Sequence, residues 1–278
     1  MVTDIKTFDF QGKAIFVKAT FKPPFRFVAQ MPDDACFYFV KGAKTQVFAP
    51  GGSIKFESDE GVVLQCGRYI NDYLASADVY ECEALAVHFF PDVLNVVYDN
   101  DFPDFLVQMN EMTPATFERV ESSSLLQAYV ESLDFYFENP SLVSDELMKL
   151  KLKELLLLLA KTNNVDIIRS LLSGVAGSQR IGFKEVVEAN LFNNLSIDEL
   201  ANLTHLSLSS FKREFVRRYD DTPARYIKKR KLEKAAKLLK ATDLRISDVA
   251  YDCGFNDLAH FSRSFSKMFG CQPSAYRQ

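Results

Sequence analysis

The last third of the chain contains one residue pattern twice, and this repeat limits the possible folds more than any other feature of the sequence. Positions of the first copy recur 49 or 50 residues later, and the matching pairs are Leu200 and Val249, Phe211 and Phe261, Arg213 and Arg263, Phe215 and Phe265, Pro223 and Pro273, and Tyr226 and Tyr276. The change from 49 to 50 indicates one residue added in a turn of the second copy. A repeat held in this register predicts two copies of one supersecondary unit.

The first copy predicts a short helix, a turn and a longer helix. Ser196 lies three residues before Glu199, which is the capping-box spacing at the start of a helix. Ser207 is suited to cap the second helix, because a serine hydroxyl accepts a hydrogen bond from a free backbone amide. The apolar face of that helix consists of Leu208, Phe211 and Phe215. The opposite face is then exposed and carries Ser209, Ser210, Lys212, Arg213 and Arg217.

The second copy repeats this arrangement. Gly254 marks the turn, and Asn256 is the expected cap of the second helix. The expected inward residues are Leu258, Phe261, Phe265 and Phe269. The expected outward residues are His260, Arg263, Ser264 and Lys267.

The segment between the copies predicts one long helix. Thr222 followed by Pro223 is a cap with proline at the first helical position, and no helix breaker occurs before about Ala241. A helix of this length measures roughly 28 Å at about 1.5 Å per residue. Successive major grooves on one face of B-DNA lie about 34 Å apart. The spacing therefore predicts that a single chain presents two recognition helices to adjacent grooves.

Residues 183–278 resemble the DNA-binding domain of the AraC/XylS family of bacterial transcription regulators. The residues that carry the resemblance are the run Ile246-Ser247-Asp248-Val249-Ala250-Tyr251-Asp252-Cys253-Gly254-Phe255, then Phe261 to Phe265, Phe269-Gly270, and Pro273 to Arg277. The resemblance covers about a third of the chain. It implies an all-α domain with two helix-turn-helix motifs, and double-stranded DNA as the partner.

The resemblance also implies which side chains contact DNA. The expected contact residues are Ser209, Ser210, Lys212, Arg213 and Arg217 in the first copy, and Asn256, His260, Ser262, Arg263 and Lys267 in the second. Leu258 and Ala259 match base-reading positions of the family but cannot hydrogen-bond a base, so the second helix is expected to read less. His205 stands where the first turn usually has glycine, and histidine tolerates the left-handed conformation better than most residues.

The charge distribution agrees with DNA binding only when the chain is divided. The whole chain has a formal net charge of -4, which alone disfavours a nucleic-acid partner. Residues 181–278 contain 17 Lys and Arg against 12 Asp and Glu, a net charge of +5, and the remainder has a net charge of -9. The basic charge therefore lies where the two motifs lie, which suits salt-dependent binding to DNA phosphates.

The N-terminal part has the pattern of a β sandwich or barrel. Short aromatic and β-branched runs are separated by proline, glycine and aspartate, and the expected strands are residues 14–21, 26–30, 36–40, 45–49, 53–56, 61–67 and 84–90. The family resemblance implies a cupin-like jelly roll here. The expected fold class is α+β with two domains: 1–172 for sensing and dimerisation (β-barrel about 1–112, helices about 114–172), a linker at 173–182, and the DNA-binding domain at 183–278.

The helical stretch that follows the strands has two interpretations. Expected helices are residues 117–137, 144–161 and 164–172, and the second is rich in leucine. Its apolar face packs against the barrel in one interpretation. In the other, which the family resemblance supports, the chain forms a homodimer through Leu147, Leu150, Leu155 and Leu158.

The resemblance implies that the N-terminal domain senses a signal. An apolar effector pocket is expected to be lined by Phe16, Phe27, Phe37, Phe39 and Tyr69, although the same residues also suit a plain hydrophobic core. A regulatory protein in place of a small molecule is the alternative. The expected function is a sequence-specific DNA-binding transcription regulator, more often an activator in this family, with RNA polymerase as a further partner in that case.

A cupin-type metalloenzyme fused to a DNA-binding domain is the rival hypothesis. Such a site needs several histidines and a carboxylate, and the chain has three histidines, of which only His88 lies in the N-terminal part. Cys82 and His88 are the one candidate nucleophile and base pair. We therefore expect no catalytic activity, no bound metal and no cofactor. The five widely spaced cysteines and the missing signal peptide favour a cytoplasmic protein, and the apolar run at 155–160 is too short to cross a membrane.

Overall fold

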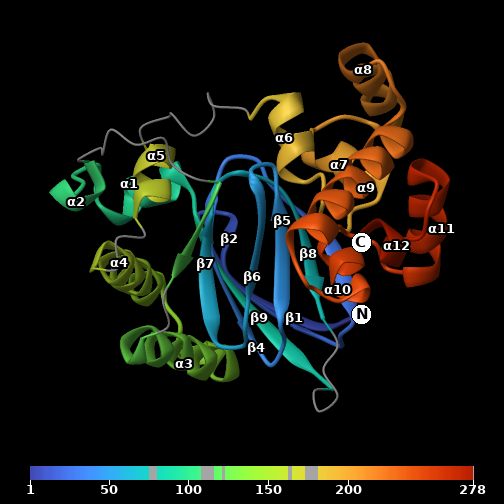
Figure 1. Ribbon diagram of the computed structural model, residues 1–278. Helices are drawn as coiled ribbons and strands as arrows, with labels where there is room; N and C mark the ends of the chain where they lie inside the picture. The colour runs from blue at the N-terminus through green and yellow to red at the C-terminus, as the bar shows by residue number, and fades with distance from the viewer. Residues whose placement is uncertain (75–79, 108–115, 121–122, 162–164, 173–180, 278) are drawn as a thin grey trace. The chain divides into compact units, whose positions relative to one another are not determined.

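The structure is a computed structural model, and it describes residues 1–74, 80–107, 116–120, 123–161, 165–172 and 181–277 (Figure 1). The chain folds into two compact units. One is formed by Met1–Ala49 and Ile54–Arg180, and the other by Pro50–Ser53 and Ile181–Gln278. The expected fold class is confirmed, because a β-rich part precedes an all-helical part.

Two antiparallel sheets form the β part. The six-stranded sheet has the order β1 (Val2–Phe10), β2 (Lys13–Phe21), β9 (Cys82–Phe89), β4 (Ala35–Lys41), β7 (Glu60–Leu64) and β10 (Phe117–Val120). The four-stranded sheet has the order β3 (Phe25–Met31), β8 (Gly67–Tyr73), β5 (Thr45–Ala49) and β6 (Gly52–Phe56). Each of the seven expected strands corresponds to one of these elements, whereas β1, β8 and β10 were not expected.

Strand β4 shows how the first unit is layered. All its residues from Ala35 to Val40 are buried, because both faces of the strand are covered. Phe37 and Phe39 point to the side that the helices cover, and Tyr38 points to the opposite side, toward the four-stranded sheet. The Tyr38 hydroxyl forms a hydrogen bond with the Tyr73 hydroxyl on β8, which joins the two sheets.

Helices cover the outer face of the six-stranded sheet. They are α1 (Pro91–Val97), α2 (Asp104–Val107), α3 (Ser124–Glu138), α4 (Asp145–Lys161) and α5 (Asp166–Leu172), with a 3-10 turn at Pro140–Leu142. Leu152, Leu155, Leu156 and Leu159 of α4 are fully buried in the same cluster as Phe37 and Phe39. A partly buried ion-pair network also connects the helices to this sheet, since Lys18 of β2 and Lys41 of β4 both bind the carboxylate of Asp134 on α3.

The expected helix at residues 117–137 is wrong at its start. Phe117–Val120 forms β10, which pairs with β7 in the register Phe117 to Leu64. The helix begins only after Ser123, whose hydroxyl accepts a hydrogen bond from the amide of Leu126 at 3.2 Å. The other two helices were predicted closely. Residue 164, and residues 173–180 of the expected linker at 173–182, lie outside the described residues.

The five expected pocket residues do not face one space. Phe16, Phe37 and Phe39 belong to the cluster beneath the helices, and Tyr69 belongs to the cluster between the sheets. Phe27 is 36% exposed and stacks on Tyr73 at a ring separation of 6.1 Å. The alternation of side chains along each strand separates these aromatic residues, which sequence composition alone does not reveal.

Asn71 indicates a candidate ligand position between the two sheets better than the five aromatic residues do. It is paired with Phe27 of β3 and Val47 of β5, so it lies on the inner face of its sheet. The side chain is buried, and its Oδ1 atom has no hydrogen-bond partner among the residues that the structure describes. An unsatisfied amide oxygen in an apolar layer costs free energy, so this position suits a polar group of a ligand.

The expected dimer residues are divided by burial. Leu155 is fully buried in the core and is not available for a partner, whereas Leu147 and Leu158 are half-buried and Leu150 is 62% exposed. Leu157, which the sequence analysis did not select, is 51% exposed and lies seven residues after Leu150. The exposed apolar stripe of α4 is therefore Leu150 and Leu157.

The five cysteines, all of them among the described residues, form no disulfide bond. Cys36, Cys82 and Cys253 are buried, and Cys66 and Cys271 are half-buried. Within the described residues, no helix combines the length and apolar character that crossing a membrane requires.

Glu118 on β10 gives the first prediction. Burial, together with the nearby carboxylate of Asp166, raises the pKa of Glu118 from 4.5 to about 7. Between these values the folded state keeps a proton that the unfolded state has released, so stability should fall as pH rises through this interval. Glu118→Gln should flatten this pH dependence in urea unfolding curves recorded from pH 5 to 8. The exposed Glu131→Gln is the matched control, and an unchanged slope in Glu118→Gln would contradict the assignment.

Candidate nucleic-acid interface

The second unit contains the repeated motif as two helical subdomains. The first consists of α6 (Phe183–Ala189), α7 (Ile197–Leu203) and α8 (Leu208–Tyr219). The second consists of α10 (Ile246–Asp252), α11 (Leu258–Phe269) and α12 (Pro273–Arg277). Helix α9 joins them and spans Pro223–Ala241, the bounds that the sequence predicts. Its N-terminal residue is proline as expected, but the Thr222 side chain makes no capping hydrogen bond.

Local signals in the first copy act as the sequence predicts. The Glu199 amide donates to the Ser196 hydroxyl at 3.2 Å, and the Ser196 amide donates to the Glu199 carboxylate at 2.7 Å. The Ser207 hydroxyl accepts a hydrogen bond from the Ser210 amide at 3.3 Å and so caps α8. These bonds satisfy amides that a helix start leaves free.

Buried aromatic rings fix which face of α8 is exposed. Phe211 and Phe215 are fully buried and pack against each other and against Phe183 of α6. The opposite face of α8 consequently points to solvent. Its exposed residues are Ser209, Lys212, Arg213 and Arg217, and Ser210 is half-buried at the edge.

The cations of this face differ in their local pairing. The Arg217 guanidinium donates to both carboxylate oxygens of Glu214, at 2.9 and 2.6 Å. This pairing, with Arg218, lowers the pKa of Glu214 to about 2. Lys212 has no ion-pair partner among the residues that the structure describes, and Arg213 makes only a long 3.4 Å bond to the Ser210 hydroxyl. Lys212 and Arg213 are thus the available donors.

Helix α11 presents a similar face in the second copy. Phe261 and Phe265 are fully buried, and His260, Arg263 and Lys267 are exposed, with Ser262 half-buried. The expectation for Ser264 is wrong, because this residue is 94% buried on the inner side of the helix, with only 6% of its surface exposed. Sequence spacing placed it near the boundary of the apolar stripe, where small polar residues are tolerated on either side.

The cap of α11 is also different from the expectation. Asp257, not Asn256, accepts the hydrogen bond from the Ala259 amide, at 2.8 Å. The Asn256 side chain instead donates to the Asn194 side chain at 3.1 Å. Asn256 remains exposed, so it stays close to the candidate surface while its amide group is engaged with the first subdomain.

Both turns use a left-handed residue at the equivalent position. His205 has φ 58° and Gly254 has φ 76°. The following amides donate to carbonyls at equivalent positions of the two short helices, Leu206 to Ala201 at 3.1 Å and Phe255 to Ala250 at 3.0 Å. The first turn therefore keeps its geometry although histidine replaces the usual glycine.

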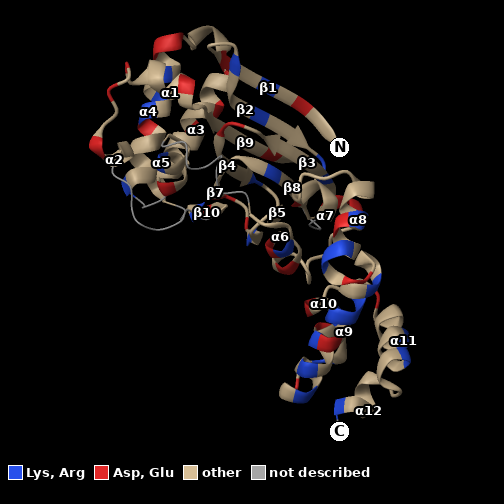
Figure 2. Cartoon of the chain, turned by 90° about the horizontal axis from the view of Figure 1, so that it is seen from above, with Lys and Arg blue, Asp and Glu red and all other residues tan. Residues whose placement is uncertain are grey.

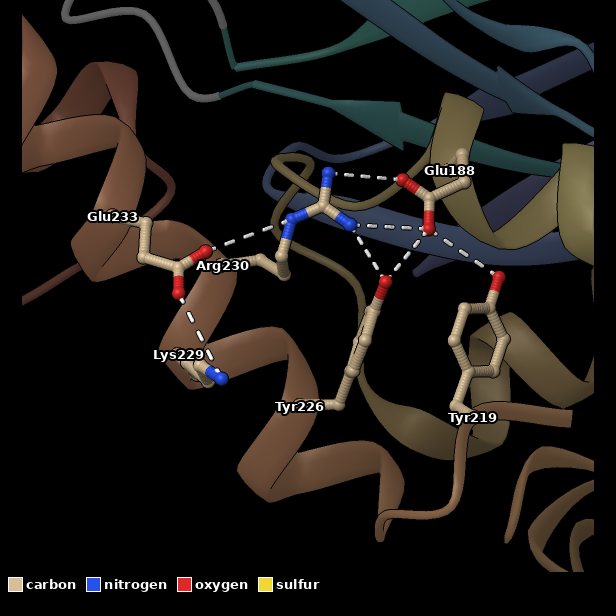
Figure 3. A network of polar contacts seen from close by, with 6 residues as sticks. All are labelled: Glu188, Tyr219, Tyr226, Lys229, Arg230 and Glu233. Carbon is tan, nitrogen blue, oxygen red and sulfur yellow. Dashed lines mark hydrogen bonds and ion pairs between the residues drawn. The ribbon is translucent and has the colours of Figure 1, made fainter. Parts of the chain in front are cut away.

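A polar network that local sequence patterns do not indicate connects α6 with α8 and α9 (Figure 3). Glu188 of α6 accepts hydrogen bonds from the hydroxyls of Tyr219 at 3.4 Å and Tyr226 at 3.0 Å, and it pairs with Arg230 of α9 at 3.2 Å. Burial and Glu188 raise the pKa of Tyr226. The residues lie up to 42 positions apart, so no local pattern indicates them.

Basic residues recur along α9 as well as on the recognition helices (Figure 2). The cations of α9 are Arg225, Lys228, Lys229, Arg230, Lys231, Lys234, Lys237 and Lys240, against a single acidic residue, Glu233. Arg225, Lys228, Lys229, Lys237 and Lys240 are exposed. This distribution gives the unit a positive field that favours a polyanionic partner.

Two family models match the chain. Residues 200–278 match a model described as a helix-turn-helix domain, and residues 35–170 match one described as the ExsA N-terminal regulatory domain. The regulatory model thus covers the first unit from β4 into α5 and leaves β1, β2 and β3 outside the match, and the other model spans both recognition helices.

Curated relatives are similar in sequence to this chain over most of their length. The virulence regulon transcriptional activator VirF of Yersinia enterocolitica is 26% identical over 274 residues, which is 94% of this chain and 95% of VirF. The transcriptional activator RhaS of Escherichia coli O157:H7 is 29% identical over 66% of this chain and 68% of RhaS. Among solved structures, fatty-acid-bound ToxT from Vibrio cholerae is similar at 13% identity and a TM-score of 0.38, over 95% of each chain.

The two turns give a paired prediction. A Cβ atom on Gly254 would lie 2.5 Å from the Phe192 carbonyl oxygen, and the backbone there is left-handed. Gly254→Ala should therefore destabilise the second unit by about 1–3 kcal/mol. His205→Gly should be tolerated, because glycine adopts this conformation without steric cost. Urea unfolding followed by circular dichroism measures both, and equal effects of the two substitutions would contradict the prediction.

Proposed function

We propose that this chain, which belongs to the AraC/XylS family of transcription regulators, binds a two-part promoter site through the exposed faces of α8 and α11. The observation that carries the proposal is the duplication itself. Each copy buries an aromatic pair of its recognition helix and exposes a polar face with at least two cations. A helix of this kind fits the major groove, which is wide enough to admit it.

The contacts divide into base-reading and phosphate-binding groups. We assign base readout to Ser209, Lys212 and Arg213 of α8 and to His260, Ser262 and Arg263 of α11. Arg217 and Lys267 lie closer to the helix ends, and Arg217 is already paired with Glu214, so these two suit phosphate contacts. Leu258 at the start of α11 is exposed and apolar, which suits contact with a thymine methyl group.

We further propose that the first unit transmits a signal to the DNA-binding unit. The match to a regulatory domain over residues 35–170 supports a sensing role. The buried, unsatisfied Oδ1 of Asn71 supports a small-molecule effector held between the two sheets, with a donor group facing this atom. A regulatory protein that binds the unit's surface is the alternative. Either ligand would act by shifting the population of DNA-binding conformations.

Activation of transcription is the proposed outcome. VirF and RhaS are both transcriptional activators, and the similarity of the present chain to them, with its matches to a regulatory-domain model and a helix-turn-helix model, supports the same outcome here. An activator bound at a promoter contacts RNA polymerase, which we propose as a further partner. The proposal places the protein in the cytoplasm, where bacterial promoter DNA lies.

Selective enrichment of random DNA with the full-length protein tests the proposed function. A motif with two short boxes about one helical turn apart is expected, because two recognition helices on one face of DNA enter successive grooves. Recovery of a single short box would limit recognition to one subdomain. Recovery of no sequence from the protein, with or without cell extract as a source of effector, would reject sequence-specific binding.

The α8 donors give a prediction on specificity. Lys212→Ala and Arg213→Ala should each weaken binding to the enriched site by about 1–3 kcal/mol, with a smaller loss on random DNA, if they contact base edges. Lys237→Ala removes the same charge from an exposed position of α9 and is the matched control. Equal losses on specific and random DNA would reassign Lys212 and Arg213 to phosphate contacts.

The exposed stripe of α4 gives a prediction on oligomeric state. We propose that Leu150 and Leu157, with the half-buried Leu147 and Leu158 beside them, form a two-fold homodimer contact. Leu150→Glu should then shift the protein to monomers in sedimentation velocity runs at micromolar concentration, because a buried unpaired carboxylate opposes association. Leu125→Glu, at an equally exposed leucine of α3, is the control. A monomeric native protein, or an unchanged dimer in Leu150→Glu, would reject this interface.

A further inference from the structure

The two subdomains of the DNA-binding unit have separate hydrophobic cores. Phe211 and Phe215 belong to one cluster, and Phe261 and Phe265 belong to the other. Helix α9 contributes to both, through Tyr226 and Ile227 at its beginning and through Leu232, Ala235, Ala236 and Leu239 further on. Because the cores are not continuous, α9 and polar contacts at the junction must set the angle between the subdomains.

Lys231 lies at this junction, directly before the part of α9 that enters the second core. Its ammonium group donates to the Gly254 carbonyl at 2.9 Å and to the Asn193 carbonyl at 3.5 Å. Gly254 is in the turn of the second motif, and Asn193 follows α6 of the first subdomain. Burial lowers the pKa of Lys231, and no carboxylate lies within ion-pair distance among the described residues. The ammonium is thus held by carbonyl groups from both subdomains.

Lys234, one helical turn later, makes the same connection. Its ammonium donates to the Asp252 carbonyl at the end of α10, at 3.1 Å, and lies 4.2 Å from the centroid of the Phe192 ring. A cation is favourable at both places, since a helix C-terminus and an aromatic face are negative. The side-chain bond between Asn256 and Asn194 is a third link between the same two segments.

The backbone of the segment that follows α6 lies close to the backbone of the turn before α11. A Cβ atom on Gly254 would lie 2.5 Å from the Phe192 carbonyl oxygen and 2.8 Å from the Lys231 ammonium nitrogen. Only glycine leaves room for the second turn to sit here. The contact therefore depends on backbone atoms and on a glycine at this position, and not on flexible side chains alone.

We infer that Lys231 and Lys234, here called the lysine bridge, are positioning residues that fix the orientation of α8 relative to α11. The inference rests on the proposed two-part DNA site and extends it: the bridge would set which spacing between the two boxes the protein accepts. With the bridge intact, binding of one recognition helix places the other over its box. Without it, each subdomain still folds on its own core, but the second contact loses much of its effective concentration.

The first experiment measures orientation without DNA. Labels for electron spin resonance are placed by unnatural amino acids at Val216 on α8 and Met268 on α11, both exposed, in the full-length protein. A narrow distance distribution is expected for the native sequence and a broader or shifted one for Lys231→Met, which keeps the apolar stem and removes the ammonium. Lys237→Met, an equal charge loss elsewhere on α9, should leave the distribution unchanged. An unchanged distribution in Lys231→Met overturns the inference.

The second experiment measures DNA binding to the enriched two-box site and to probes with either box scrambled. Lys231→Met should lose about tenfold or more in affinity for the two-box probe, while its affinity for each single-box probe stays close to that of the native protein. It should also become more tolerant of one base pair inserted between the boxes. Equal losses on all probes would assign Lys231 to phosphate binding or to folding, and would overturn its positioning role.

Lys234→Met serves as the second variant, because its side chain lies nearer the surface and its loss is less disruptive to folding. The same two effects, smaller in size, are expected, and their absence in a folded Lys234→Met protein overturns the role of the bridge if Lys231→Met does not fold. The two proposals remain separable. Failure of the native protein to enrich a two-box site rejects the proposed DNA site, whereas the label distances test the bridge in either case.

Discussion

Burial of one aromatic pair in each subdomain is the interaction on which the DNA-binding unit depends. Phe211 with Phe215, and Phe261 with Phe265, are fully buried phenylalanine side chains in their small clusters. Truncating a buried phenylalanine typically costs about 3–5 kcal/mol, which a cluster of this size cannot replace from other contacts. Because these rings occupy one side of each recognition helix, the residues on the other side are exposed. The basic and polar face is thus a consequence of where the aromatic residues are placed.

In the first unit, too, the placement of apolar residues corresponds to the faces that are buried. Strand β4 is buried at every position from Ala35 to Val40 because helices cover one face and the four-stranded sheet covers the other. Strand β1 is the opposite case: it lies at the edge of its sheet, and its residues from Val2 to Thr7 are all exposed. Residues 1–180 have a net formal charge of -9 and residues 181–278 a net formal charge of +5, so the basic unit is the one that attracts DNA.

The sequence predicted local structure well and long-range contacts poorly. The capping box at Ser196 and the bounds of α9 were correct because they depend on residues a few positions apart. Strand β1 was missed because most residues on both of its faces are exposed, so apolar and polar residues do not alternate along it as they do in a half-buried strand. The Glu188 network and the lysine bridge were missed for another reason: they join residues from 18 to 42 positions apart, and a lysine within a basic helix usually points to solvent. Only the pairing of the strands shows that Phe37 and Tyr69 belong to different hydrophobic clusters.

The added residue of the second copy connects these observations. His205 and Gly254 correspond at an offset of 49, whereas Phe211 and Phe261 correspond at 50, so the extra residue lies between Gly254 and α11. In the first copy Ser207 follows the turn and caps α8 directly. In the second copy the longer turn lets Asp257 take over capping, and this leaves the Asn256 side chain available for Asn194 of the first subdomain. The insertion disturbs neither helix, because it falls where the backbone is irregular. Its effect is to give the second motif a polar contact that the first lacks, beside the lysine bridge, and so to make two similar subdomains into one unit with a defined internal geometry.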